Sequence, residues 1–125
     1  MGATSYRFSL SWARILPQGT GVENQAGIQY YKNLLAALES RGITPAVTLY
    51  HWDLPQALED QGGWLNADIA LWFEEYARVC FREFGDKVRR ISSLENLPNL
   101  FKLCDVGQVL DNLERAMGAI CSWLW

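Results

Sequence analysis

The chain has 125 residues, 50% of them hydrophobic and 20% charged, so its composition fits one folded domain and excludes a disordered segment. Its net charge is −3 and it has no basic block, which argues against nucleic acid or an anionic membrane as a partner. With one histidine and three widely spaced cysteines, no metal site is expected, and no apolar run is long enough to span a bilayer.

A strand and a helix are predicted in the first third of the chain. From residue 6 to residue 12 (YRFSLSW), large apolar side chains occupy every second position, which is typical of a strand. Pro17 and two nearby glycines indicate a loop. From Asn24, a suitable N-cap, apolar residues recur at three- and four-residue steps as far as Leu38, and Gly42 is placed to end this helix.

A second strand, a second helix and a third strand follow. Residues 44–50 form a short apolar run rich in β-branched and aromatic residues, and a polar loop comes after them. Asn66 is predicted to cap a long amphipathic helix that ends at Gly85, and a strand should begin near Val88. Strands that alternate with helices predict an α/β fold with parallel strands, in which both faces of the sheet are covered.

The last 30 residues have a different pattern. Asp105 and Gln108 form a capping-box signature, and an apolar stripe follows as far as Ile120, so a helix is predicted from about residue 105. The chain ends with Trp123 and Trp125, and this helix with its two tryptophans predicts a contact surface for a protein partner.

Three segments carry a specific resemblance, and they read YRFSLSWARILPQGTG, NQAGIQYYKNLLAALESRGITPAVTLYHWDLPQAL and GGWLNADIALWFEEYARVCFREFGDKV. In this order they resemble glycoside hydrolase family 1, the β-glucosidase and lactase-like retaining enzymes, including the cytosolic β-glucosidase type. The resemblance implies a partial (β/α)8 TIM barrel, about strands 2 to 4 with their helices, over residues 1–90. Residues 91–125 are then a divergent tail. The match already holds at residues 1–6, so we expect the chain to start inside the family's sequence.

The resemblance also bears on the catalytic carboxylates. The family's fourth strand reads tryptophan-isoleucine-threonine-leucine-asparagine-glutamate-proline, and its glutamate is the acid/base. Counted without gaps from Phe84, this glutamate position holds Asn96, and Glu95 lies one residue earlier. A one-residue offset turns a strand side chain to the other face, and an amide has no proton to give, so Glu95 is expected to be incidental. The nucleophile motif is not found in this sequence, and no catalytic residue is assigned.

His51 and Trp52 are the candidate substrate-binding residues. Read from the residues alone, His51 is a lone histidine at a strand end, for which a structural role is the simplest interpretation, and Trp52 is indistinguishable from a core aromatic. In a (β/α) barrel, however, residues at the carboxyl ends of strands line the active site. In the family this histidine contacts a sugar hydroxyl in the first subsite, and the tryptophan helps to shape that subsite.

Arg7 and Asp53 are the two charged residues that need an interpretation. In the family the arginine hydrogen-bonds the nucleophilic carboxylate, so Arg7 is assigned a nucleophile-supporting role. Without that carboxylate we expect Arg7 to be unpaired, or paired with water or a local acid. Asp53 with Gln56 is read as a capping box of a short helix that includes Pro55, and not as a catalyst.

The resemblance implies a truncated retaining β-glycosidase that binds β-glucosides or β-galactosides, needs no cofactor, is cytoplasmic and is inactive by itself. The alternative is a non-catalytic, glycosidase-like interaction or regulatory module, with the C-terminal helix as its contact surface. A third possibility is that the chain has no selected function.

Overall fold

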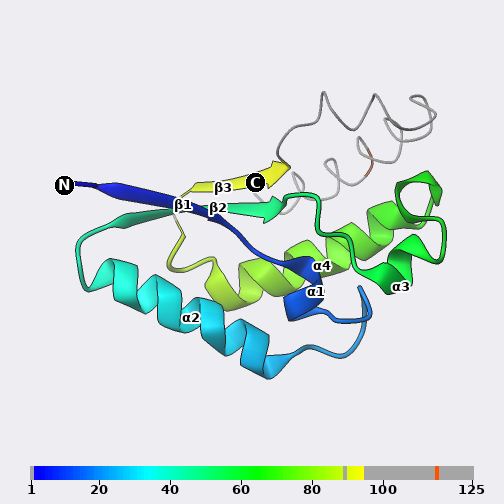
Figure 1. The fold of residues 1–125 in the computed structure, drawn as a ribbon, viewed down its shortest axis with the longest axis horizontal. Coiled ribbons are helices and arrows are strands. Elements are labelled where there is room, and N and C mark those ends of the chain that lie inside the picture. Colours follow the sequence, from blue (N-terminus) through cyan, green and yellow to red (C-terminus); the bar gives the residue numbers. More distant parts are fainter. Residues whose placement is uncertain (1, 89, 95–114, 116–125) are drawn as a thin grey trace.

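The predicted alternation of strands and helices is present in the computed structural model, which describes residues 2–88, 90–94 and 115 (Figure 1). In chain order its elements are β1 (Ser5–Ser9), α1 (Trp12–Ile15), α2 (Gln25–Glu39), β2 (Thr44–Tyr50), α3 (Gln56–Glu59), the 3₁₀ turn η1 (Gly63–Leu65), α4 (Ile69–Phe84) and β3 (Arg90–Leu94). The predicted strand over residues 44–50 and the helix after Asn24 are confirmed at these bounds.

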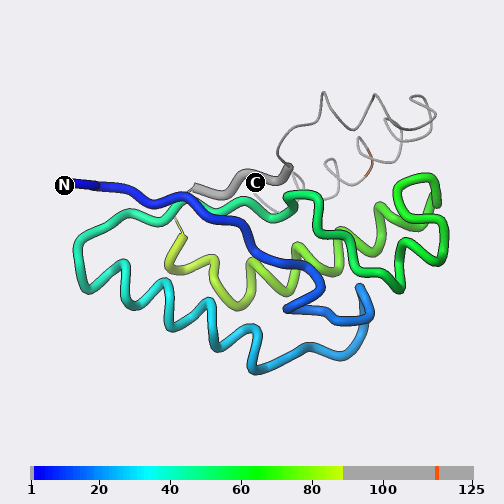
Figure 2. The backbone as a smooth tube through the Cα atoms, viewed as in Figure 1, coloured from blue at the N-terminus to red at the C-terminus, as the bar shows by residue number. Residues whose placement is uncertain are grey.

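The three strands form one parallel sheet in the order β1-β2-β3. Ser9 of β1 is opposite Thr48 of β2, and Tyr50 of β2 is opposite Leu94 of β3. The backbone trace shows α2 and α4 on the same side of this sheet (Figure 2). The α/β arrangement with parallel strands is therefore confirmed, but the two long helices cover one face of the sheet and not both as expected. No helix within the described part of the chain is both long enough and apolar enough to cross a membrane.

The strand predicted for residues 6–12 is shorter than its apolar pattern indicated, because β1 ends at Ser9. Leu10 and Trp12 are buried, but Trp12 is the first residue of α1 and not part of the strand. Its indole stacks on Tyr76 of α4, with 4.8 Å between the ring centroids, and its ring N–H donates a 2.8 Å hydrogen bond to the Gly19 carbonyl. The period-two pattern continued past the strand because the next turn of chain folds back into the same core.

Tyr76 connects α4 to the middle of the sheet. Its side chain is fully buried, and its hydroxyl donates a 2.7 Å hydrogen bond to the Leu49 carbonyl of β2. Burial holds the pKa of Tyr76 well above its usual value, so the hydroxyl stays protonated and remains a donor. The core therefore fixes β2 from the helix side of the sheet.

The structure differs from the sequence prediction at the N-termini of the two long helices, α2 and α4. Asn24 precedes α2 as expected, but its side chain makes no capping hydrogen bond. The second long helix begins at Ile69, and not directly after Asn66. The Asn66 side-chain oxygen instead accepts the Asp68 N–H at 2.9 Å, which closes a turn ahead of the helix.

Gly27 allows α2 to approach α1 closely. A Cβ atom at this position would overlap with the Arg14 carbonyl oxygen. The Arg14 guanidinium lies over the Tyr30 ring, 4.7 Å from its centroid, on the next turn of α2. The glycine in the NQAG segment is thus required by the packing between these two helices.

Four charged side chains join α2 and α4 to the loop before α2. Glu83 accepts hydrogen bonds from Lys32 at 2.6 Å and from Arg82 at 2.8 Å. Arg82 also donates to Glu23 at 2.7 Å. The hydrogen bonds from Lys32, and then from Arg82, lower the pKa of the Glu83 carboxyl.

This lowered pKa predicts how stability depends on pH. The folded chain binds the Glu83 proton less readily than the unfolded chain, so this stabilisation is complete above the unfolded pKa of about 4.3 and is lost as the pH falls through the folded value. In Glu83→Gln we expect a shallower fall of the melting temperature between about pH 5 and pH 3 than in the unaltered chain. The control is Glu74→Gln, which removes the exposed pair with Arg78. Equal slopes in all three proteins would contradict the prediction.

Candidate functional site

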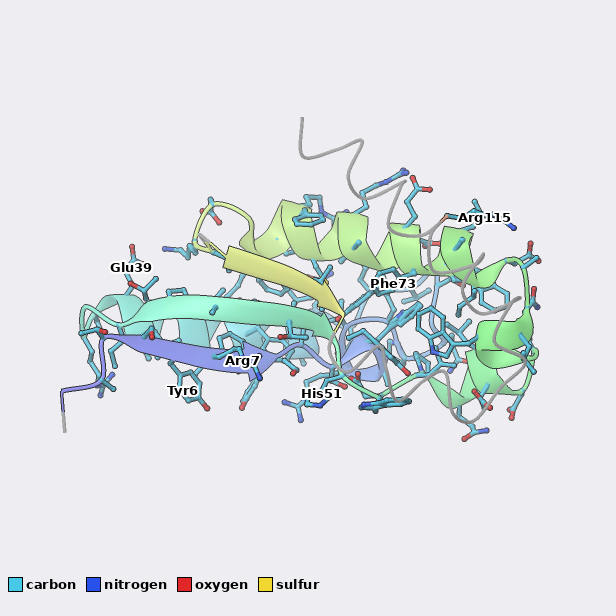
Figure 3. The ribbon with its side chains drawn as sticks, turned by 90° about the horizontal axis from the view of Figure 1, so that it is seen from above. Tyr6, Arg7, Glu39, His51, Phe73 and Arg115 are labelled. Carbon is cyan, nitrogen blue, oxygen red and sulfur yellow. The ribbon has the colours of Figure 1, made fainter. Side chains whose placement is uncertain are left out.

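The carboxyl ends of β1 and β2 meet at one end of the sheet, because the two strands are parallel. His51 follows β2 directly, and its ring Nδ1 is 3.4 Å from the Ser9 hydroxyl at the end of β1. Figure 3 shows His51 just beyond the end of β2, on the side of the sheet where β1 lies. The imidazole is therefore an exposed group that joins two strand ends, and its second nitrogen is not used by this contact.

Ser9 was not predicted as part of the site. The signal that could have found it is the strand alternation, because Ser9 is two residues after Arg7 and so lies on the same face of β1. Pairing of Ser9 with a residue 42 positions away, however, depends on the tertiary fold.

Trp52 has an unusual backbone. Its φ is 64°, in the left-handed region that residues with a β-carbon rarely adopt, and its side chain is 43% exposed. The ring is not a core aromatic, so the structural interpretation from the sequence is wrong for this residue. It presents a large apolar surface beside His51.

Asp53 does not form the predicted capping box with Gln56. Its Oδ2 accepts the backbone N–H of Trp12 at 3.0 Å, and its Oδ1 accepts the backbone N–H of His51 at 3.3 Å. Gln56 instead donates to Asp60 at 2.7 Å, and no side chain caps α3. Asp53 therefore caps α1, a helix that lies 41 residues earlier in the sequence.

Two buried tyrosines make hydrogen bonds close to the site. The Tyr50 hydroxyl accepts the indole N–H of Trp64 at 3.1 Å, and the Tyr31 hydroxyl accepts the Ser11 N–H at 2.8 Å. Burial raises the pKa of both tyrosines, so they remain neutral. Tyr31 holds the backbone after β1, Tyr50 binds the Trp64 side chain, and neither brings a charge to the site.

Arg7 lies on β1 about 7 Å along the strand from Ser9, by the usual strand rise, and its side chain is exposed. Figure 3 shows Arg7 and His51 along the same edge of the molecule. Arg7 takes part in an interaction of its own, so of the alternatives expected for this residue the unpaired one does not hold.

Other expectations from the sequence do not bear on this site. Glu95, Asn96 and nearly all of the predicted C-terminal helix lie outside the described residues. Of that helix only Arg115 is described, and it donates a 3.3 Å hydrogen bond to the Ala67 carbonyl. The described residues include no cluster of three or more side chains suited to a metal ion.

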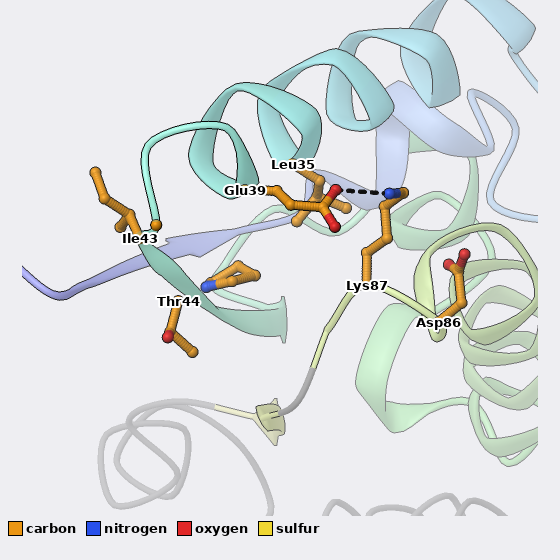
Figure 4. Close-up of a pocket in the computed structure, with 8 residues that line it drawn as sticks. Leu35, Glu39, Ile43, Thr44, Asp86 and Lys87 are labelled. Atoms are coloured by element: carbon orange, nitrogen blue, oxygen red, sulfur yellow. Dashed lines mark hydrogen bonds and ion pairs between the residues drawn. The ribbon is translucent and has the colours of Figure 1, made fainter.

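A cavity of about 400 Å³ lies elsewhere, at the amino end of β2. It is bounded by the end of α2, by residues 42–45 and by the segment after α4, where Lys87 donates to Glu39 at 2.8 Å (Figure 4). Figure 3 places Glu39 at the opposite end of the sheet from His51. This cavity is thus separate from the carboxyl ends of the strands.

The fold and the site together define a piece of an α/β protein in which the candidate side chains follow the carboxyl ends of parallel strands. The sequence model of Glycosyl hydrolase family 1 matches residues 1–105. The chain belongs to this family.

Its relatives include several β-glucosidases. Beta-glucosidase A of Thermotoga maritima is 56% identical over 89 residues, which is 71% of this chain and 20% of that protein. The cytosolic beta-glucosidase of Cavia porcellus is 53% identical over 108 residues, which is 86% of this chain and 22% of that protein. The solved structure of the Thermotoga maritima β-glucosidase in complex with noeuromycin has a TM-score of 0.92 at 41% identity, covering 97% of this chain and 31% of that one. The chain spans about a fifth of the length of the curated relatives it matches.

The backbone of Trp52 predicts an unusual order of stability between two variants. Trp52→Gly and Trp52→Ala both remove the ring, but only glycine adopts the left-handed φ at no steric cost. We expect Trp52→Gly to be the more stable of the two by about 1 kcal/mol in urea unfolding.

Leu65 provides the matched control, because it is 50% exposed and lies in η1, a helical turn. There we expect the reverse order, with Leu65→Ala more stable than Leu65→Gly. The same order at both positions would contradict the assignment of strain to Trp52.

Proposed function

We propose that this chain forms the second to fourth strands of a retaining β-glycosidase barrel and carries part of its sugar-binding subsite. His51 and Trp52 contact the sugar, and Arg7 supports a nucleophilic carboxylate. The observation that carries the proposal is the exposed His51 imidazole, held against Ser9 at the carboxyl ends of two parallel strands. This is where barrels of this type bind their substrates.

The chemistry of the two side chains supports this role. A neutral imidazole can donate from one nitrogen and accept at the other, and the Ser9 contact occupies only Nδ1. The exposed Trp52 indole offers the flat apolar surface on which a sugar ring can pack. Arg7, on the same strand as Ser9, brings a positive charge that would keep a neighbouring carboxylate ionised.

The substrates that we propose are β-glucosides and β-galactosides, because the relatives are named β-glucosidases. Relatives from Cavia porcellus and Homo sapiens are named cytosolic, which supports a cytoplasmic location. We further propose that the barrel segment expected for residues 1–90 extends to the end of β3, because β3 pairs with β2 as far as Leu94, and that a separate tail follows it.

The 125-residue chain is proposed to be inactive by itself. Retaining hydrolysis needs two carboxylates about 5 to 5.5 Å apart, one as the nucleophile and one as the acid/base. Asn96 occupies the position where the family carries its acid/base glutamate, and Glu95 is offset by one residue.

We therefore expect no release of nitrophenol from 4-nitrophenyl β-glucoside above the rate in buffer alone. The assay is run with the purified chain and with Glu95→Gln. Turnover by the chain that disappears in Glu95→Gln would overturn the proposal of inactivity and would make Glu95 a catalytic residue. Turnover that persists in Glu95→Gln would indicate a contaminating glycosidase.

Sugar binding is tested separately from hydrolysis. Methyl β-glucoside, added up to several hundred millimolar, should shift the NMR signals of His51 and of the Trp52 indole. We expect His51→Ala to abolish the shifts of Trp52, because the hydroxyl contact is lost. Asn33→Ala on the exposed side of α2 is the control and should leave them unchanged. Equal shifts in both variants would contradict a sugar-binding role for His51.

The alternative function, an interaction module, depends on the C-terminal helix and on Trp123 and Trp125. These residues lie outside the described part of the chain. No described contact favours that function, and it stays a prediction from the sequence.

A further inference from the structure

We propose that Asp53 is a positioning residue for the sugar subsite. Its carboxylate ties the turn after β2 to the start of α1 and thereby holds His51 and Trp52 in place. The inference rests on the proposed function for the roles of these two side chains, and it adds a residue to which the sequence assigned a different task.

The first step of the argument is the pair of hydrogen bonds that Asp53 accepts. One carboxylate oxygen accepts from the backbone N–H of Trp12 at 3.0 Å, and the other accepts from the backbone N–H of His51 at 3.3 Å. The first N–H groups of a helix have no partner within the helix, and the side chain at the N-cap position of α1, Ser11, provides none. Asp53 thus satisfies a group that would otherwise lack a partner in α1.

The second step is the fixed position of Trp12, to whose backbone N–H the Asp53 carboxylate binds. Trp12 is completely buried, stacks on Tyr76 and donates from its ring to the Gly19 carbonyl. Its backbone N–H therefore has a fixed position relative to the core. A carboxylate bound to it places the turn after β2 with respect to α4, and not only with respect to β2.

The third step is the backbone strain at Trp52. Trp52, whose φ is 64°, lies between His51 and Asp53. A left-handed backbone at a bulky residue persists only where its surroundings over-determine it. The two hydrogen bonds of Asp53 act on both sides of Trp52, so they are the described contacts that oppose its return to a negative φ.

The fourth step links this turn to the His51 ring. The ring contacts Ser9 at 3.4 Å, a distance near the limit for a hydrogen bond. A small rotation of the His51 backbone would separate the two groups. Loss of the Asp53 carboxylate should therefore release the His51 ring from β1 as well as the Trp52 backbone.

A role limited to capping α1 is the alternative. In that case the loss of the carboxylate would affect the Trp12 amide and overall stability, but it would leave Trp52 and His51 unchanged. The two roles differ in where the effect appears, and this makes them separable.

The test uses the full 125-residue chain, labelled with ¹⁵N and ¹³C, and the variant Asp53→Asn. Asparagine replaces one of the two carboxylate oxygens with an NH2 donor, so one of the two N–H groups loses its acceptor if the side chain keeps its position. The readouts are the intraresidue nuclear Overhauser effect between HN and Hα of Trp52, which is strongest at positive φ because the two protons are then closest, and the nuclear Overhauser effect between the His51 ring and the Ser9 β-protons. Asp60→Asn is the control, because Asp60 is an exposed aspartate whose side chain contacts Gln56.

We expect Asp53→Asn to weaken the intraresidue HN–Hα effect of Trp52 and to remove the His51–Ser9 effect, while Asp60→Asn changes neither. An Asp53→Asn chain that keeps both signals, and only shows faster exchange of the Trp12 amide, would overturn the proposal in favour of a simple cap.

A double-mutant cycle tests the same role through stability and does not depend on the NMR signals of Asp53→Asn. If Asp53 holds a strained turn, its replacement should lower the melting temperature more in the Trp52→Gly background than in the unaltered chain, because only the tryptophan chain recovers strain energy when the turn relaxes. Equal drops in the two backgrounds would overturn the proposal. The proposal would also be overturned if Asp53→Asn prevented folding in the unaltered chain and in the Trp52→Gly background.

None of these measurements uses a sugar ligand. Their failure would count against the positioning role of Asp53 and leave the subsite intact. Failure of the methyl β-glucoside titration with the unaltered chain would count against the subsite itself.

Discussion

The parallel pairing of β1 with β2 is the constraint on which the candidate site depends. Ser9 is opposite Thr48, and the ladder extends one residue further through the Leu10 N–H, which donates to the Thr48 carbonyl at 2.9 Å. In this register β2 continues to Tyr50, two residues past the partner of Ser9, so His51 follows just beyond the end of β1 and its ring can reach Ser9. Since side chains alternate along a strand, a slip by one residue would turn Ser9 and Arg7 toward the helices. The register is held from the helix side, where Phe8 stacks on Tyr31 at 6.2 Å and Val47 is buried.

Trp12 connects the packing of the core to the geometry of the candidate site. Its ring belongs to the aromatic core with Tyr76 and Phe73, and its backbone N–H is the group that Asp53 binds. A change in the packing of α4 would therefore be transmitted to the turn after β2 through one buried residue. This explains how an exposed pair such as His51 and Trp52 can have a defined arrangement although few side chains surround it.

The elements that the sequence predicted correctly are those whose apolar pattern reflects their own burial. β2 is buried over its last four residues, so its limits were visible as a continuous apolar run, and the stripe of α2 faces the core at a helical period. β1 was predicted too long because Trp12 is buried through a helix that follows the strand. The task of Asp53 was mistaken because the local partner, Gln56, fits a known motif, whereas the actual partner is 41 residues away. His51, Trp52 and Arg7 could be selected from a family resemblance, but the contact between His51 and Ser9 required the fold.

The described residues also limit what this chain can contribute to sugar chemistry. A hydrogen bond to a neutral hydroxyl contributes about 1 kcal/mol net, and packing of a sugar on a half-exposed indole adds an amount of the same order. A dissociation constant of about 1 mM already corresponds to about 4 kcal/mol, so two such contacts support binding that is weaker than millimolar. Catalysis requires more, because the two carboxylates of a retaining enzyme must approach within about 5 to 5.5 Å. Under the proposed function, the described residues would therefore supply orientation and recognition at two strand ends. Tight binding of a β-glucoside by the chain alone would require contacts in addition to His51 and Trp52.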